Sequence, residues 1–153
     1  MDDPANPSPT PWATPPTAKE RNAVQHAVTA LLDELAPEKA LTRTGEQPVA
    51  VEQHRMPTGC ILQGPNAAIS VSWYPDAGEE SAFGELDVVV WRGVVSRRGA
   101  PPRREGATIV GALELRPVEK SPGVFVWRAP DGETYHTEAL AAKCLALLEE
   151  QMR

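Results

Sequence analysis

Arginine is concentrated in one short stretch of this chain. Residues 92–104 contain five arginines and no acidic residue, whereas the whole chain has a formal net charge of −6. A guanidinium group binds carboxylate or phosphate through two parallel hydrogen bonds, a geometry that the lysine ammonium does not offer. The stretch therefore predicts a site for an anion or for an acidic partner; the alternative is a solvated loop that offsets an acidic protein. The arginines are Arg92, Arg97, Arg98, Arg103 and Arg104.

The charge of the remaining chain argues against two classes of partner. Residues 1–91 hold 5 basic and 13 acidic side chains, a net of −8, and residues 105–153 hold 5 basic and 8 acidic ones, a net of −3. An acidic surface repels nucleic acid and anionic membranes. The arginine stretch also lacks interleaved aromatic residues on which single-stranded bases could stack. We therefore expect neither nucleic acid nor a membrane as partner.

Asp87 is the residue best placed for acid–base chemistry. It lies in a strand-like segment between Leu86 and Val88, where an inward carboxyl would need a hydrogen-bond donor or a raised pKa. If the fold brought it beside His54 or His136, the pair could exchange a proton. The alternative is a position at the open end of a strand, in contact with water. Four acidic residues lie nearby: Asp76, Glu79, Glu80 and Glu85. Most of them belong to a polar loop, residues 75–81, and are expected to be solvated.

Other catalytic and metal-binding patterns are absent from the sequence. It has no P-loop, GxGxxG or GxSxG motif. The chain has three histidines without paired spacing and two cysteines without a CxxC pair, so no zinc signature is present. A site made of His54, Cys60 and His136 would depend entirely on the fold. We therefore predict no catalytic residue, no metal and no cofactor; enzymatic activity stays an open alternative to a non-enzymatic role.

Three tryptophans, Trp73, Trp91 and Trp127, lie toward the ends of strand-like segments. Tryptophan contributes strongly both to protein cores and to binding surfaces. If the three strands are neighbours, the indoles could gather on one face of a sheet. The sequence leaves two interpretations open: packing in the core, or an exposed aromatic face for a partner.

Two amphipathic helices are predicted near the two ends of the chain. Thr17 and Glu20 have the spacing of a capping box, and Pro37 ends the apolar stripe that follows. Thr137 is the expected cap of the second helix. Apolar residues then recur at helical spacing in both segments: Ala23, Val24, Ala27, Val28, Leu31, Leu32 and Leu35 in the first, and Leu140, Cys144, Leu147 and Leu148 in the second.

Strand-like patterns fill the region between the helices, with short turns between them. Consecutive strands joined by short turns favour an antiparallel meander. The predicted fold is therefore α+β: a curved antiparallel sheet of about six strands, with both helices packed on one face. The expected segments are 49–55, 59–63, 67–74, 85–96, 107–118, 123–128 and 133–136.

The segment from Glu85 is apolar on both faces, because Val88 and Val90 share one parity while Val89 and Trp91 share the other. Such a strand usually has both faces covered. The two helices cover one face only. We expect the second to be covered by curling of the sheet, by the proline-rich leader or by another subunit.

These observations define the expected organisation and role. Residues 1–16 contain six prolines and are expected to form a disordered leader before a single domain over residues 17–153. A leader without a basic or apolar signal region and a chain with few cysteines favour a cytoplasmic protein. We predict an interaction or adaptor module that binds a protein partner or itself through an apolar sheet face and the arginine stretch. The alternative is a ligand-binding domain or small enzyme with a pocket between sheet and helices.

Overall fold

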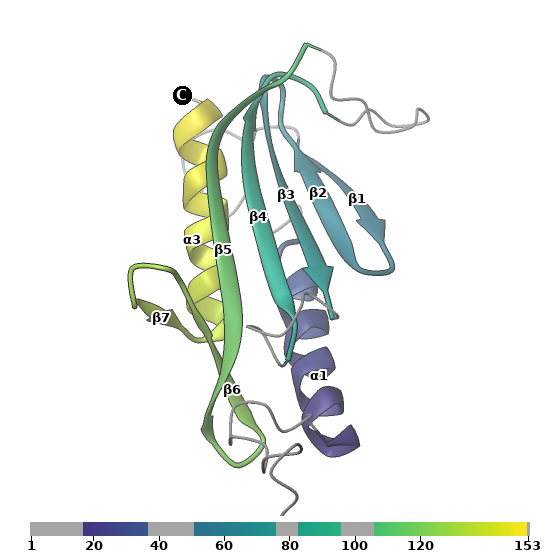
Figure 1. Ribbon diagram of the computed structural model, residues 1–153. Coiled ribbons are helices and arrows are strands. Elements are labelled where there is room, and N and C mark those ends of the chain that lie inside the picture. Colours follow the sequence, from purple (N-terminus) through teal and green to yellow (C-terminus); the bar gives the residue numbers. More distant parts are fainter. Residues whose placement is uncertain (1–16, 37–50, 76–82, 96–105, 153) are drawn as a thin grey trace, which may run out of the picture.

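The computed structural model describes residues 17–36, 51–75, 83–95 and 106–152 (Figure 1). Helix α1 (Ala18–Glu34) begins as predicted: the Thr17 hydroxyl accepts from the Glu20 amide at 3.1 Å, and the Glu20 carboxylate accepts from the Thr17 amide at 2.9 Å. These two bonds satisfy amides that have no partner within the helix.

Seven strands form one antiparallel sheet in the order of the sequence (Figure 1). Each strand therefore pairs with its neighbours along the chain, and the first and last strands have one neighbour each. The last strand contains only two residues, and helix α3 (Thr137–Met152) follows it. The strands are β1 (Glu52–Met56), β2 (Gly59–Gln63), β3 (Ala67–Tyr74), β4 (Glu85–Arg92), β5 (Thr108–Ser121), β6 (Val124–Arg128) and β7 (Thr134–Tyr135).

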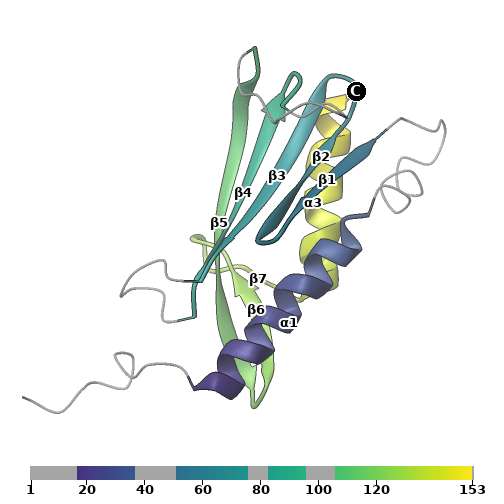
Figure 2. The ribbon, with the colours of Figure 1, turned by 90° about the vertical axis from the view of Figure 1, so that its right-hand side faces the viewer.

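Both helices pack on the same face of the sheet, which we call the helix face (Figure 2). The main core lies between the helices and the sheet. It contains alternate residues of the central strands, such as Ile69, Val71, Val88 and Leu115. This arrangement confirms the predicted α+β fold with a curved meander and two helices on one face. Seven strands are observed where about six were expected, and the short β7 lies within the last expected segment, 133–136.

Strand boundaries differ from the expectation at β4 and β5. The predicted segment 85–96 ends as a strand at Arg92, because Gly93 has a φ of +111° and turns the chain out of the ladder. Strand β5 continues three residues beyond the predicted end at Val118, to Ser121, and has a register shift opposite Val90 and Trp91. That shift is a bulge that increases the local twist of the sheet.

The second face of the sheet, which we call the open face, carries a small apolar cluster of its own. Ile61, Ala68 and Trp91 are buried there together with Val95, and Ala107 packs against them. The segments on either side of the arginine stretch therefore fold over this face near the end of β4. Val95 and Ala107 therefore cover part of the second face of β4, and this cover is none of the three that the sequence led us to expect.

Two further expectations concern the proline-rich leader and the absence of a membrane-spanning helix. The proline-rich leader predicted over residues 1–16 lies outside the described residues. In the described part of the chain, neither helix has the length and apolar character required to cross a bilayer.

Candidate functional site

Four of the five arginines proposed as an anion site, Arg97, Arg98, Arg103 and Arg104, lie outside the described residues. The fifth, Arg92, is exposed at the end of β4 and donates a hydrogen bond of 3.1 Å to the Gln151 side chain of α3. The anion site therefore stays a prediction.

The three tryptophans lie in the interior, on two different faces of the sheet. Trp73 and Trp127 belong to the main core, where their rings meet edge to face with centroids 5.8 Å apart. Trp91 lies in the open-face cluster and donates a 3.0 Å hydrogen bond from Nε1 to Ser70. All three indoles are therefore packed in apolar clusters, and the fold brings Trp73 and Trp127 together. A binding role for these indoles stays a prediction.

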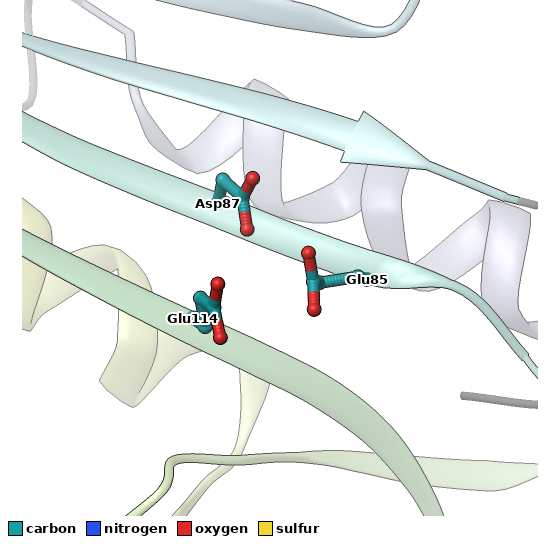
Figure 3. A group of neighbouring side chains, drawn as sticks. All are labelled: Glu85, Asp87 and Glu114. Carbon is teal, nitrogen blue, oxygen red and sulfur yellow. The ribbon is translucent and has the colours of Figure 1, made fainter. Parts of the chain in front are cut away.

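Three carboxylates, Glu85, Asp87 and Glu114, converge on the open face (Figure 3). One oxygen from each lies within 4.8 Å of the others. Asp87 and Glu114 face each other directly across the pairing of β4 with β5, and Glu85 lies two residues along β4. Sequence analysis placed Glu85 at the start of a strand and did not connect Glu114 with Asp87, because that contact depends on the register between the two strands.

The environment of this acidic trio disfavours the charged form of two of its members. Burial raises the pKa of Asp87, and the charge of Glu114 raises it further, although hydrogen bonding with Glu85 acts in the opposite direction. Burial and the charge of Asp87 raise the pKa of Glu85 as well, whereas the positive charge of Arg116 acts in the opposite direction. Asp87 Oδ1 is buried without a hydrogen-bond partner in the described structure. The trio is therefore a concentration of negative charge that the positive charge of Arg116 offsets in part.

The histidines and cysteines considered for chemistry lie elsewhere. His54 is exposed on β1, three strands from Asp87, and His136 is exposed between β7 and α3. Cys60 belongs to the main core under the helices, whereas His54 pairs with Ile61 and so lies on the open face. Burial raises the pKa of Cys60 to about 11 and that of Cys144 to about 12, which leaves both thiols protonated and weakly nucleophilic.

Replacing Asp87 with asparagine is expected to stabilise the protein at neutral pH by about 0.2–1 kcal/mol, since like charges directly opposite in a sheet repel. The folded-state pKa of Asp87 is raised, so folding favours its protonated form. The gain should therefore be full above that raised value and disappear as the pH falls toward the ordinary aspartate pKa of about 3.9. Urea denaturation between pH 3.5 and 8 measures the difference.

Glu52→Gln is the matched control for Asp87→Asn, because Glu52 lies on the same face and faces the neutral Gln63. We expect its effect at neutral pH to stay within about 0.5 kcal/mol. Loss of stability in Asp87→Asn at pH 7 would contradict the proposed repulsion.

Gln63 holds the start of the β4–β5 connection against the sheet. It is a buried polar side chain with 7% exposure, and its Oε1 accepts a 2.7 Å hydrogen bond from the Val95 amide. Its Nε2 contacts the carbonyl oxygens of Gly64, Ala67 and Gly93 at 2.7–3.0 Å. This one amide therefore fixes the segment that covers Trp91, a role that no sequence pattern indicated.

Strand β5 has a free edge along its first half. Its pairing with β6 begins at Arg116, so no described strand pairs with the outer side of residues 108–115. Helix α3 packs mainly on β3 and β4 instead (Figure 2). Ile109 and Val110 are 56% and 41% exposed on this edge. We call residues Thr108–Leu115 the β5 edge.

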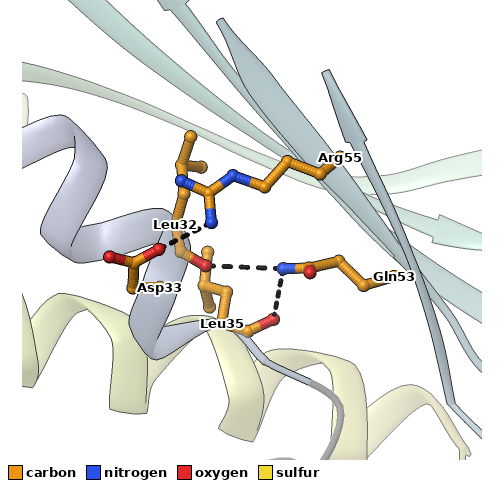
Figure 4. Close-up of polar contacts among 5 residues, drawn as sticks. All are labelled: Leu32, Asp33, Leu35, Gln53 and Arg55. Carbon is orange, nitrogen blue, oxygen red and sulfur yellow. Dashed lines mark hydrogen bonds and ion pairs between the residues drawn. The ribbon is translucent and has the colours of Figure 1, made fainter. Parts of the chain in front are cut away.

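The opposite edge of the sheet, strand β1, is polar and attached to α1 (Figure 4). Gln53 donates to the carbonyl oxygens of Leu32 and Leu35 at 3.4 and 3.1 Å, which satisfies acceptors at the end of the helix. Arg55 forms an ion pair of 2.6 Å with Asp33. Charged edge strands resist pairing with other chains. The β5 edge has no charged residue from 108 to 113 and lacks this protection.

The chain was compared with protein-family models, with curated proteins and with solved structures, and none of the three comparisons found a match.

Proposed function

We propose that this protein is a non-enzymatic interaction module that binds an extended segment of a protein partner along the β5 edge. The observation that carries the proposal is an edge strand of eight residues, Thr108–Leu115. Its outer side pairs with no described strand, and its first six positions are uncharged. Unpaired backbone amides and carbonyls on such an edge are a template for one more strand.

Strand addition accounts for both affinity and selectivity at such an edge. Main-chain hydrogen bonds supply the attraction, and side chains at alternate positions select the sequence that binds. The exposed Ile109 and Val110 favour an apolar, β-branched segment as occupant. The arginine stretch precedes this edge in the chain, so we propose that it contributes contacts to acidic residues of the partner.

The open face offers less apolar surface for a partner than the sequence suggested, because Trp91 and its apolar neighbours are buried together with Val95, and Ala107 packs against them. The interval between sheet and helices is filled by fully buried side chains such as Trp127, Leu140 and Leu31. In the described part of the chain, no observation favours the alternative of a small-molecule pocket there.

A display library of ten-residue peptides, selected against the full chain, tests the proposal. Selected peptides should be extended and rich in β-branched residues, and Val110→Lys should weaken their binding by at least about tenfold, or 1.4 kcal/mol. Val124→Lys is the matched control, because Val124 is a strand valine of similar exposure, 45%, away from this edge. It should leave binding within about twofold.

Circular dichroism of both lysine variants should match the wild type, since both positions face water. Peptides that bind Val110→Lys as tightly as wild type would locate the interaction elsewhere and overturn the proposal. Failure to enrich any extended peptide would also count against it.

A further inference from the structure

We infer that Gly111 determines which segments bind the β5 edge: the bound segment carries an aromatic side chain that lies across Gly111 on the helix face. The inference rests on the proposed function, because it names the chemistry of the segment that would occupy the same edge. Apolar, β-branched residues stay the expected choice at the other positions of that segment.

A bulge in β5 decides which residues of the edge share a face. Trp91 pairs with Ile109, and the preceding residue of β4, Val90, pairs with Gly111. Val110 is therefore one extra residue in β5, and the alternation of faces along the strand is interrupted there. Gly111 lies on the helix face with Val90, which belongs to the main core. Ile109 lies on the open face with Trp91.

Nothing in the described part of the chain requires a glycine at position 111. A Cβ atom built there would meet only the Val90 side chain, at 3.7 Å, which is an ordinary van der Waals distance. Within a strand, glycine is unfavourable and often marks a bulge or a place where another chain approaches closely. No residue of this bulge has a positive φ, so the bulge itself needs no glycine. Gly111 therefore fits a point of close approach.

Leu147 of α3 lies on the flank of the helix that faces this part of the sheet. One turn before it, Lys143 Nζ lies 5.7 Å from the centre of the Tyr135 ring of β7. One turn after it, Gln151 accepts the hydrogen bond from Arg92 of β4. Residues four apart share a helix flank. Leu147 therefore faces the part of the sheet that β4, β5 and β7 form.

Leu147 also lies at about the level of Gly111. Arg92 pairs with Thr108 at the start of β5 and contacts Gln151, so the end of α3 is level with that start. Helix α3 and strand β5 run in opposite directions (Figure 1). Leu147 lies about 6 Å before Gln151 along the helix. Gly111 lies up to about 10 Å beyond Thr108 along the strand.

An aromatic ring suits the position across Gly111. Leu113, the next helix-face residue of β5, pairs with Val88 of the main core. Leu113 and Leu147 both pack against this core and are only partly buried. Gly111 has no side chain to cover them, whereas an aromatic residue on an added strand can compensate for an edge glycine. A ring also extends further than valine or isoleucine, so it would reach α3 as well as cover the glycine.

Ten-residue peptides selected on the wild type test the inference. Those whose binding Val110→Lys weakens should share an aromatic residue at one position. Replacing that residue with alanine in a synthetic peptide should weaken binding to the wild type at least about tenfold, or 1.4 kcal/mol. In Gly111→Val, the valine side chain takes the place of the ring. The aromatic and alanine peptides should then bind this variant within about twofold of each other.

Ala112→Val is the matched control, because it adds bulk at the next residue but on the open face, where Ala112 pairs with Val89. It should keep the preference for the aromatic peptide. Gly111→Ala adds only a Cβ atom, for which the structure has space. It should reduce the preference in part and leave the urea midpoint unchanged or higher. This second variant keeps the test valid if valine disturbs the fold.

Methyl NMR spectra give a direct readout of where the ring lies. The aromatic peptide should shift the methyl signals of Leu113 and Leu147 through its ring current, and the alanine peptide should shift them much less. The methyl signals of Val124, which lies away from this edge, should not change. Unshifted Leu113 and Leu147 signals would place the ring elsewhere and overturn the inference.

The outcomes separate this inference from the proposed function. Peptides that depend on Val110 but share no aromatic residue would overturn only the inference. An aromatic preference that persists in Gly111→Val would do the same. If no selected peptide depends on Val110, both proposals fail. A large loss of stability in Gly111→Ala would show that the fold itself needs the glycine, which removes the basis of the inference.

Discussion

Changing Trp127 to alanine is expected to lower the free energy of unfolding by about 3–5 kcal/mol. The side chain is fully buried, packs edge to face on Trp73, and donates a 3.2 Å hydrogen bond from Nε1 to the Thr137 hydroxyl. Truncation removes the packing of a large ring and leaves a cavity where the sheet meets the start of α3. Urea denaturation followed by circular dichroism gives the difference.

Trp127→Phe separates the packing of Trp127 from its hydrogen bond, because phenylalanine keeps an aromatic ring in the core but has no N–H. We expect it to lose clearly less stability than Trp127→Ala. Val124→Ala, at an exposed position of the same strand, should change stability by no more than about 0.5 kcal/mol. A loss below about 1 kcal/mol for Trp127→Ala would contradict the central place of this residue in the core.

Replacing Gln63 with methionine is expected to cost about 2–4 kcal/mol, since a side chain of similar length would leave buried polar groups without partners. The Val95 amide and three carbonyl groups now share the Gln63 amide. The Val95 amide should also lose its protection against hydrogen exchange, because its acceptor is Gln63 Oε1. Exchange measured by NMR reports this local opening, and urea denaturation reports the global loss.

Gln53→Met is the comparison for Gln63→Met, because Gln53 is a half-buried strand glutamine that bonds to two carbonyl groups at the end of α1. Its expected loss is smaller, about 1 kcal/mol. Unchanged protection of the Val95 amide in Gln63→Met would show that the open-face cluster holds the connection without the glutamine.

Local patterns predicted the elements of this fold well. The capping box at Thr17 and the alternation in Ala67–Tyr74 depend on residues close in sequence, and both are confirmed. Thr137 differs from its prediction as a helix cap: α3 begins at this residue, and its hydroxyl accepts a hydrogen bond from Trp127. A distant indole that binds the same oxygen cannot be read from a local pattern.

The candidate site was less predictable because it depends on register and pairing. Asp87 was identified as unusual, but its neighbour Glu114 is brought opposite to it only by the pairing of β4 with β5. The free edge of β5 likewise follows from the point at which β6 begins to pair, at Arg116. An uncharged run from 108 to 113 was visible in the sequence, yet only the strand order shows that it lies at an edge.

The contrast between the two edges of the sheet limits how large an assembly can become. Strand β1 carries charged side chains and is attached to α1, so it offers no second adhesive surface. A contact that uses one patch on both copies is closed by symmetry, whereas a head-to-tail contact propagates. If strand addition takes place at the β5 edge, as proposed, association through this sheet stops once that edge is covered and cannot grow into a filament.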